Sequence, residues 1–112
     1  LHSTDTTPHD ATMRYIFESV DGSAAVYFNS DNDTTDSDSS TVHTMVDDTF
    51  VTLAAYYDGG TTIQLFADDV LVTTMTSITV PAAEMAVGFG YINGAAGAET
   101  TDVDYIFVAK ER

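Results

Sequence analysis

The chain of 112 residues is long enough for one domain with a single core, and its 44% of apolar residues is too high for a disordered segment. Its formal net charge of −15 argues against binding to nucleic acid or to an anionic membrane surface, because both repel a polyanion. The absence of cysteine excludes disulfides and thiolate chemistry, and no apolar run approaches the roughly 20 residues that span a bilayer.

The first twelve residues differ in character from the rest of the chain. Residues 1–12 are polar, contain Pro8 and show neither a helical nor a strand period, which predicts a flexible N-terminal arm or linker. Residues 13–112 form the predicted domain. Because the chain begins with Leu1 rather than Met, we expect a processed product or a fragment of something longer.

A β-hairpin is predicted next. Residues 13–19 alternate between apolar and polar side chains, residues 21–23 supply a turn, and residues 25–29 form a second apolar strand. The following stretch, 30–40, contains four Asp and four Ser and no apolar side chain. We therefore expect an exposed loop there, since such a segment buries too little to offset the entropy of ordering.

The middle of the chain reads as four strands joined by acidic or glycine-rich turns. The predicted strands are 41–46, 50–57, 61–67 and 70–76, and the predicted turns are 47–48, 58–60 and 68–69. Both faces of residues 50–57 are apolar, which predicts an inner strand. Two further strands are expected at 84–92 and 101–109, the last contributing one face to the core. About eight short strands without a helical period indicate an all-β antiparallel β-sandwich.

Residues in the second half carry a resemblance to a known family. Residues 48–59 followed by 62–72 are similar to the central hairpins of concanavalin A-like (laminin G-like) jelly rolls, with Phe50 at the usual aromatic position and Asp69 in place of the usual turn glycine. The ending 103–112 resembles the closing strand of such domains in bacteriophage virion structural proteins. The resemblance covers roughly the whole predicted domain and implies a jelly-roll fold. The family's first strands are short or missing in this sequence, so the resemblance implies either the C-terminal part of a longer domain or a compact version of the fold.

The same resemblance implies a function. It favours a non-enzymatic virion structural protein, a capsid decoration, cement or fibre component of a tailed phage, located on the capsid exterior or in a fibre. Its partners would be neighbouring capsid or virion subunits, with the chain as a homo-oligomer that docks through the arm and one sheet edge. Fourteen of the eighteen acidic residues are Asp, which suits the exterior of a particle or a high-salt setting.

The acidic loop is the candidate metal site. Asp31, Asp33 and Asp36 have the alternating oxygen ligands of a calcium loop. An EF-hand is excluded, because position six of a loop starting at Asp31 is Asp36 rather than Gly and position twelve is Val42 rather than Glu. A looser calcium site at the rim of a jelly roll and a solvated acidic loop both stay open.

Catalytic groups are scarce. The E-x-D-x-x-E strand motif of jelly-roll glycoside hydrolases is absent, as are a nucleophile elbow and a phosphate loop. Of the three histidines, His2 and His9 fall in the arm, and His43 falls on a predicted strand without an orienting partner. We therefore expect no enzyme and no catalytic residues.

Exposed aromatic residues support the alternative function. Tyr56, Tyr57 and Tyr91 are the candidates for a carbohydrate-binding platform, in a secreted or surface lectin-like module assisted by calcium. Such platforms usually include Trp, which this chain lacks. The other interpretation is that these tyrosines fill the sandwich and keep their hydroxyls at its edge.

Overall fold

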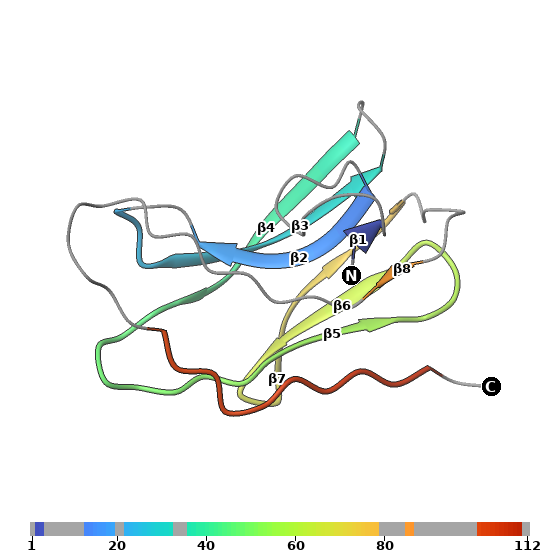
Figure 1. Cartoon of the computed structure of the whole chain (residues 1–112). Coiled ribbons are helices and arrows are strands. Elements are labelled where there is room, and N and C mark those ends of the chain that lie inside the picture. The colour runs from blue at the N-terminus through green and yellow to red at the C-terminus, as the bar shows by residue number, and fades with distance from the viewer. Residues whose placement is uncertain are drawn as a thin grey trace.

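The computed structural model describes residues 2–3, 13–19, 22–32, 36–78, 85–86 and 101–110. These residues form strands and connections only, arranged in two layers (Figure 1). The strands are β1 (His2–Ser3), β2 (Met13–Ser19), β3 (Ala25–Asn32), β4 (Asp36–Thr44), β5 (Leu53–Tyr57), β6 (Ile63–Ala67), β7 (Val70–Met75) and β8 (Met85–Ala86). The expectation of an all-β chain is confirmed.

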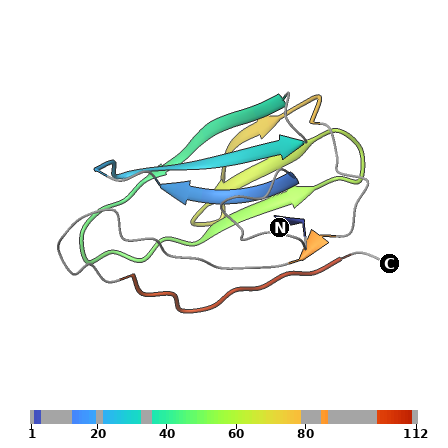
Figure 2. The ribbon, with the colours of Figure 1, turned by 45° about the horizontal axis from the view of Figure 1, so that its top comes forward.

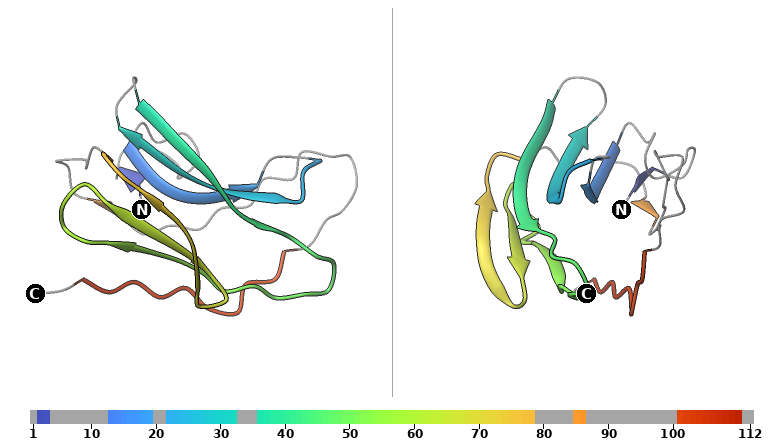
Figure 3. Two further views of the ribbon diagram at one scale, coloured as in Figure 1. Left: turned by 180° about the vertical axis from the view of Figure 1, so that it is seen from behind. Right: turned by 90° about the vertical axis from the view of Figure 1, so that its left-hand side faces the viewer.

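The strands make two antiparallel sheets. One has the order β4-β3-β2-β1-β8 and the other the order β5-β6-β7. Every strand pair in the described part of the chain is antiparallel. Figure 2 and the end-on view of Figure 3 show the β4-β3-β2 layer lying across the β5-β6-β7 layer.

The core lies between the two sheets. Phe28 and Val42 from the first sheet pack against Ile63 and Leu65 from the second, together with Ile78 just after β7. Ile63 and Leu65 sit at alternate positions of β6, so the period of two places both side chains on the inner face. The predicted inward direction of Ile63 and Leu65 is confirmed.

The first predicted hairpin is confirmed. β2 pairs with β3 in a register that sets Phe17 opposite Phe28, and Gly22 in the connection has a φ of 74°, which favours glycine. The Phe17 and Phe28 rings meet edge to face with centroids 5.0 Å apart, while Tyr15 stacks on Phe28 at 6.3 Å. Aromatic packing across this hairpin therefore anchors the first sheet on the core.

The predicted loop at 30–40 is wrong over most of its length. β3 continues to Asn32, and β4 begins at Asp36 and pairs with it in the register Asn32↔Asp36. The ladder uses backbone groups and does not need apolar side chains. In addition, Ser30 is buried, and Asp31 accepts a hydrogen bond from Arg14, so the polar side chains have partners.

The second predicted hairpin is also confirmed. β6 and β7 are joined by Asp68 and Asp69, which both have positive φ, 49° and 64°, as a two-residue type I′ turn requires. Asp47 and Asp48 form a turn as expected, with φ of 55° at Asp48. Aspartate tolerates this left-handed conformation better than most residues do, which explains turns without glycine.

Two expectations about the second sheet are corrected. Residues 50–57 were expected to form an inner strand, yet only 53–57 form β5, which lies at the end of the sheet, and β6 is central. Residues 101–109 were expected to form a strand with one face in the core. The structure describes no strand within 101–110, and every residue there is exposed. In both segments the apolar side chains are therefore mostly exposed to solvent rather than buried in the core.

The N-terminal segment is described at two residues. His2 and Ser3 form β1, which pairs with β2 at Arg14 and with β8 at Met85 and Ala86. The rest of the predicted arm, 1–12, lies outside the described residues. The same holds for most of the predicted strand 84–92.

Candidate functional site

The first component of the candidate site is the outer edge of β5, called its free edge because β6 is the single strand that pairs with β5 among the described residues. The hydrogen bond from Asp58 N–H to the Thr62 carbonyl (3.3 Å) and that from Asp68 N–H to the Thr52 carbonyl (2.8 Å) flank the β5–β6 ladder. In an antiparallel ladder, residues alternate between bonding the partner and facing away. The even-numbered residues of β5 therefore bond β6. The backbone groups of Leu53, Ala55 and Tyr57 point toward the free edge.

The segment 101–110 is the second component. It runs beside the free edge of β5, in the same direction as that strand, in Figures 1 and 2, and the end-on view of Figure 3 places it beyond β5 in the order β7, β6, β5. Among the described residues, no backbone hydrogen bond joins it to β5. Its large apolar side chains are exposed, up to 80% at Phe107; they are Val103, Tyr105, Ile106, Phe107 and Val108.

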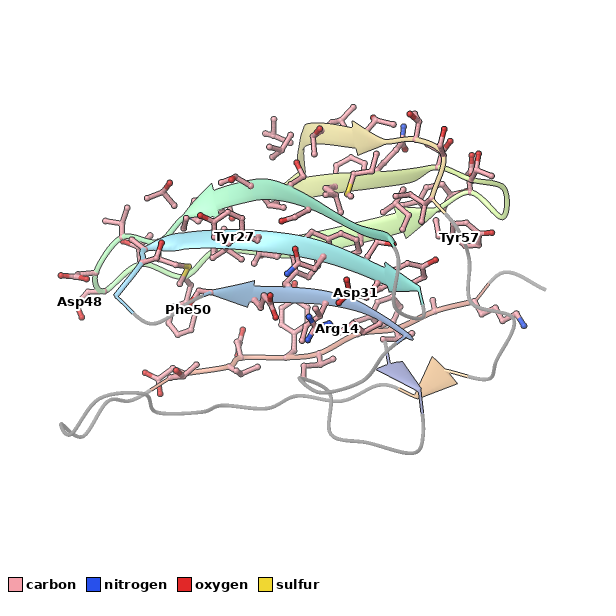
Figure 4. All side chains as sticks on the ribbon, turned by 90° about the horizontal axis from the view of Figure 1, so that it is seen from above. Arg14, Tyr27, Asp31, Asp48, Phe50 and Tyr57 are labelled. Atoms are coloured by element: carbon pink, nitrogen blue, oxygen red, sulfur yellow. The ribbon has the colours of Figure 1, made fainter. Side chains whose placement is uncertain are left out.

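An open pocket of about 230 Å³ separates the start of this segment from the residues that lead into β5. Phe50 and Tyr105, exposed at 71% and 65%, are among the residues that line it, as are Asp102 and Asp104. Figure 4 shows Phe50 and Asp48 at the same end of the molecule. Segments 50–53 and 102–105, distant in sequence, are thus neighbours in the fold.

The predicted carbohydrate platform is divided by the strand geometry. Tyr56 and Tyr57 are adjacent on β5 and exposed, but consecutive residues of a strand point to opposite faces of the sheet. Tyr57 shares the inner face with Leu53, and its hydroxyl donates to the Gly60 carbonyl (2.7 Å). Tyr56 lies on the outer face. Tyr91 lies outside the described residues.

The predicted calcium ligands are placed on two strands. Asp31 is near the end of β3, Asp36 is the first residue of β4, and Asp33 lies outside the described residues. Asp31 Oδ2 accepts a hydrogen bond from Arg14 Nε at 2.5 Å. In the described part of the chain, no group of three or more His, Asp or Glu side chains is arranged to hold a metal ion.

A polar cluster around Arg14 was missed at the level of sequence. Arg14 lies between the carboxylates of Asp31 and Glu18, the second at 3.9 Å, and Asn29 donates a short hydrogen bond to Glu18 Oε1. Figure 4 shows Arg14 and Asp31 pointing toward each other. Register brings them together, since Arg14 on β2 is directly opposite Asp31 on β3. The sequence signal was the single cation within a run of strand residues.

Tyr15 follows Arg14 in β2, so its side chain points to the opposite, inner face of the sheet. Burial raises the pKa of its hydroxyl above the ordinary value of 10.0, and the nearby Tyr57 adds to this rise in the pKa. A hydrogen bond with the Ser30 side chain acts in the opposite direction on the same pKa. Tyr15 therefore remains neutral throughout the physiological range, as a core contact between the two sheets.

The remaining sequence candidates lie apart from these groups. His43 is on β4 opposite Val26 and is half-buried. The Asp47–Asp48 and Asp68–Asp69 pairs occupy turns, and Asp68 Oδ1 accepts a hydrogen bond from Thr52 N–H (3.0 Å). His2 belongs to β1, and His9 lies outside the described residues.

Among the described residues, no helix is long and apolar enough to cross a membrane. Comparisons with protein-family models, with curated proteins and with solved structures found no significant match to this chain. The candidate site of the described structure thus consists of the free edge of β5 and the exposed apolar segment 101–110.

Proposed function

We propose that this chain is a non-enzymatic structural protein of a virion, a concanavalin A-like jelly-roll domain that serves as a capsid decoration, cement or fibre component of a tailed phage. In this role the chain binds neighbouring subunits through protein–protein contacts. The observation that carries the proposal is the exposure of the apolar segment 101–110, because such a segment on an otherwise acidic chain marks an interaction surface.

Three further points support the proposal. The exposed segment is the one whose sequence resembles the closing strand of virion jelly rolls. The two packed antiparallel sheets are the layers from which a jelly roll is built. The net charge of −15 keeps the remaining surface hydrated and repels non-specific association, which suits the exterior of a particle.

A second candidate function is saccharide binding, favoured by the open pocket beside β5. The Phe50 and Tyr105 rings provide apolar faces for a sugar ring, and Asp102 and Asp104 provide acceptors for sugar hydroxyls. This pocket differs from the tyrosine platform expected from the sequence. Glycan-array binding that is lost in Tyr105→Ala and retained in Tyr56→Ala would favour this second function.

The experiment that tests the proposed function is fractionation of the native source material on a density gradient, followed by peptide mass spectrometry. We expect peptides of this chain to co-sediment with assembled phage particles and gold-labelled antibodies to mark the particle exterior. Detection of the protein only in the free fraction, with no binding to purified particles when added back, would exclude a virion role. A free protein that binds a glycan would instead be the lectin-like module.

A further inference from the structure

We infer that the free edge of β5 is an interface between two copies of this chain, in which residues 103–108 of each copy add as a strand to β5 of the other. The inference rests on the proposed assembly function and specifies its partner and contact surface. It follows from three observations. The outer edge of β5 has no ladder partner among the described residues, the apolar segment 101–110 has none there either, and the directions and charges of the two fit an exchange between copies.

The edge strand β5 carries neither the charged side chains nor the proline that often protect exposed strands. β5 has the sequence LAAYY, with no charged residue and no proline, and Leu53, Ala55 and Tyr57 direct backbone groups outward. A regular edge of this kind is a template for another strand. The complementary strand is in the same molecule, because 105–109 is also uncharged and makes no backbone ladder within the described structure.

Direction favours a second copy over the chain's own segment. Within one chain, 101–110 runs in the same direction as β5, so closure onto its own β5 would add a parallel strand (Figure 1). All other pairs described are antiparallel, and parallel pairs are weaker and seldom leave a face exposed. A two-fold axis perpendicular to β5 reverses the partner's segment and makes the added strand antiparallel. The same axis forms both contacts and closes the dimer.

Charge favours the same arrangement. The N-terminal end of β5 lies beside the Asp68–Asp69 turn, and its C-terminal end is followed by Asp58 alone. An antiparallel strand brings the cation of Lys110 to the end with two aspartates and moves Asp102 and Asp104 away from it. A parallel strand does the reverse and sets four carboxylates together. The antiparallel exchange is therefore the arrangement with the smaller electrostatic cost.

The first test is the mass of the purified 112-residue chain by size exclusion with light scattering, from about 1 to 200 µM. We expect a dimer of twice the 12.0 kDa chain mass at the upper concentrations, and tighter association in 500 mM than in 50 mM salt, because salt screens repulsion between two acidic chains. A monomer at every concentration, with slowly exchanging amides at Ala55 and Tyr57, would show that each chain closes on itself and would overturn the inference.

Two variants remove the two halves of the contact. Ala55→Pro removes an outward N–H and leaves the β5–β6 bonds in place, whereas Ile106→Asp places a charge in the added strand. We expect each to weaken dimerisation by about 100-fold. Val70→Asp is the matched control for Ile106→Asp. It makes a similar aliphatic-to-acid change at a position of similar exposure, 65% for Val70 against 55% for Ile106. Val70 lies on β7, at the opposite side of the sheet from β5, so we expect this variant to dimerise as the unmodified chain does.

Mixing the two variants distinguishes exchange from any other dimer. Ala55→Pro retains an intact segment and Ile106→Asp retains an intact edge, so the mixture restores one of the two contacts and forms a heterodimer that neither variant forms alone. Absence of a heterodimer, with both variants folded by circular dichroism, excludes the segment-on-edge contact. This readout involves no phage particle, so a failed virion test and a failed exchange test remain separate results.

Discussion

Two hydrogen bonds join Thr52 and Asp68 and extend the β5–β6 pairing by one residue, before the start of β5 and after the end of β6. Asp68 N–H donates to the Thr52 carbonyl at 2.8 Å, and Thr52 N–H donates to the Asp68 carboxylate at 3.0 Å. The side chain of Asp68 thus completes the pair that its backbone begins. The turn at Asp68 and Asp69 is fixed by this contact on the side facing β5.

The second residue of that turn leads to the first prediction. Asp69 has a φ of 64°, which costs an L-residue about 1 kcal/mol and glycine little. We expect Asp69→Gly to stabilise the fold by about 0.5 kcal/mol, measured as a shift of the urea midpoint. Asp69→Ala is the control, since it removes the same charge without relieving φ. It should destabilise the protein, and equal effects of the two variants would assign the change to charge.

The second prediction concerns the centre of the core. Phe28 is 2% exposed and contacts the rings of Tyr15 and Phe17. Phe28→Ala is expected to lower the free energy of unfolding by about 3 to 5 kcal/mol, because it leaves a cavity between the two sheets. Phe50→Ala, at an exposed position, should change it by less than about 0.5 kcal/mol. A small effect at Phe28 would mean that the sheets do not pack as described.

The third prediction concerns the ion pair between β2 and β3. Arg14→Met leaves the carboxylates of Asp31 and Glu18, both largely buried, without their cation, and should cost about 1 to 3 kcal/mol in unfolding experiments. Asp31→Asn in the Arg14→Met background should recover part of that loss. A double-mutant cycle measures the coupling, expected near 1 kcal/mol. Additive losses would show that the two residues act separately.

The fourth prediction is a pH dependence at Tyr15. Its folded-state pKa is raised, so the folded state holds the proton more tightly than the unfolded chain does. The resulting stability is complete below the ordinary value of 10.0 and is lost as the pH rises through the folded-state pKa. Tyr15→Phe should therefore cost about 1 kcal/mol near pH 7, since buried Ser30 loses its partner, and less near pH 11. Unfolding at both pH values compares the two proteins, and a cost independent of pH would contradict this assignment.

Turn chemistry and the period of two were sufficient to predict much of the fold from sequence. The turns after Ser19, Tyr57 and Ala67 lie where glycine or aspartate permits a positive φ, and Ile63 and Leu65 face the core as alternation requires. These are local signals. They depend on the backbone preference of a residue and on its neighbours two positions away.

Long-range pairing could not be predicted in the same way. The segment 36–40 forms a strand because β3 offers it a backbone partner, and Arg14 neutralises Asp31 from a different strand. Apolar side chains on both faces of 50–57 predicted an inner strand, and those of 101–109 predicted a strand with one face in the core, whereas these residues are mostly exposed. Composition alone does not distinguish a buried strand from an interaction surface, since both require uncharged, β-favouring side chains.

The position of Arg14 also determines where and how fast a trypsin-like protease cleaves this protein. No Lys or Arg occurs between Arg14 and Lys110, so cleavage after a basic residue cannot occur anywhere within 15–109. Arg14 is held in β2 by pairing with β3 and by its carboxylate partners, whereas Lys110 is exposed. Cleavage at Lys110 removes only the last two residues. Cleavage after Arg14 requires β2 to separate from β3. The rate of this cleavage therefore measures local unfolding of the first sheet, without any label or modification of the chain.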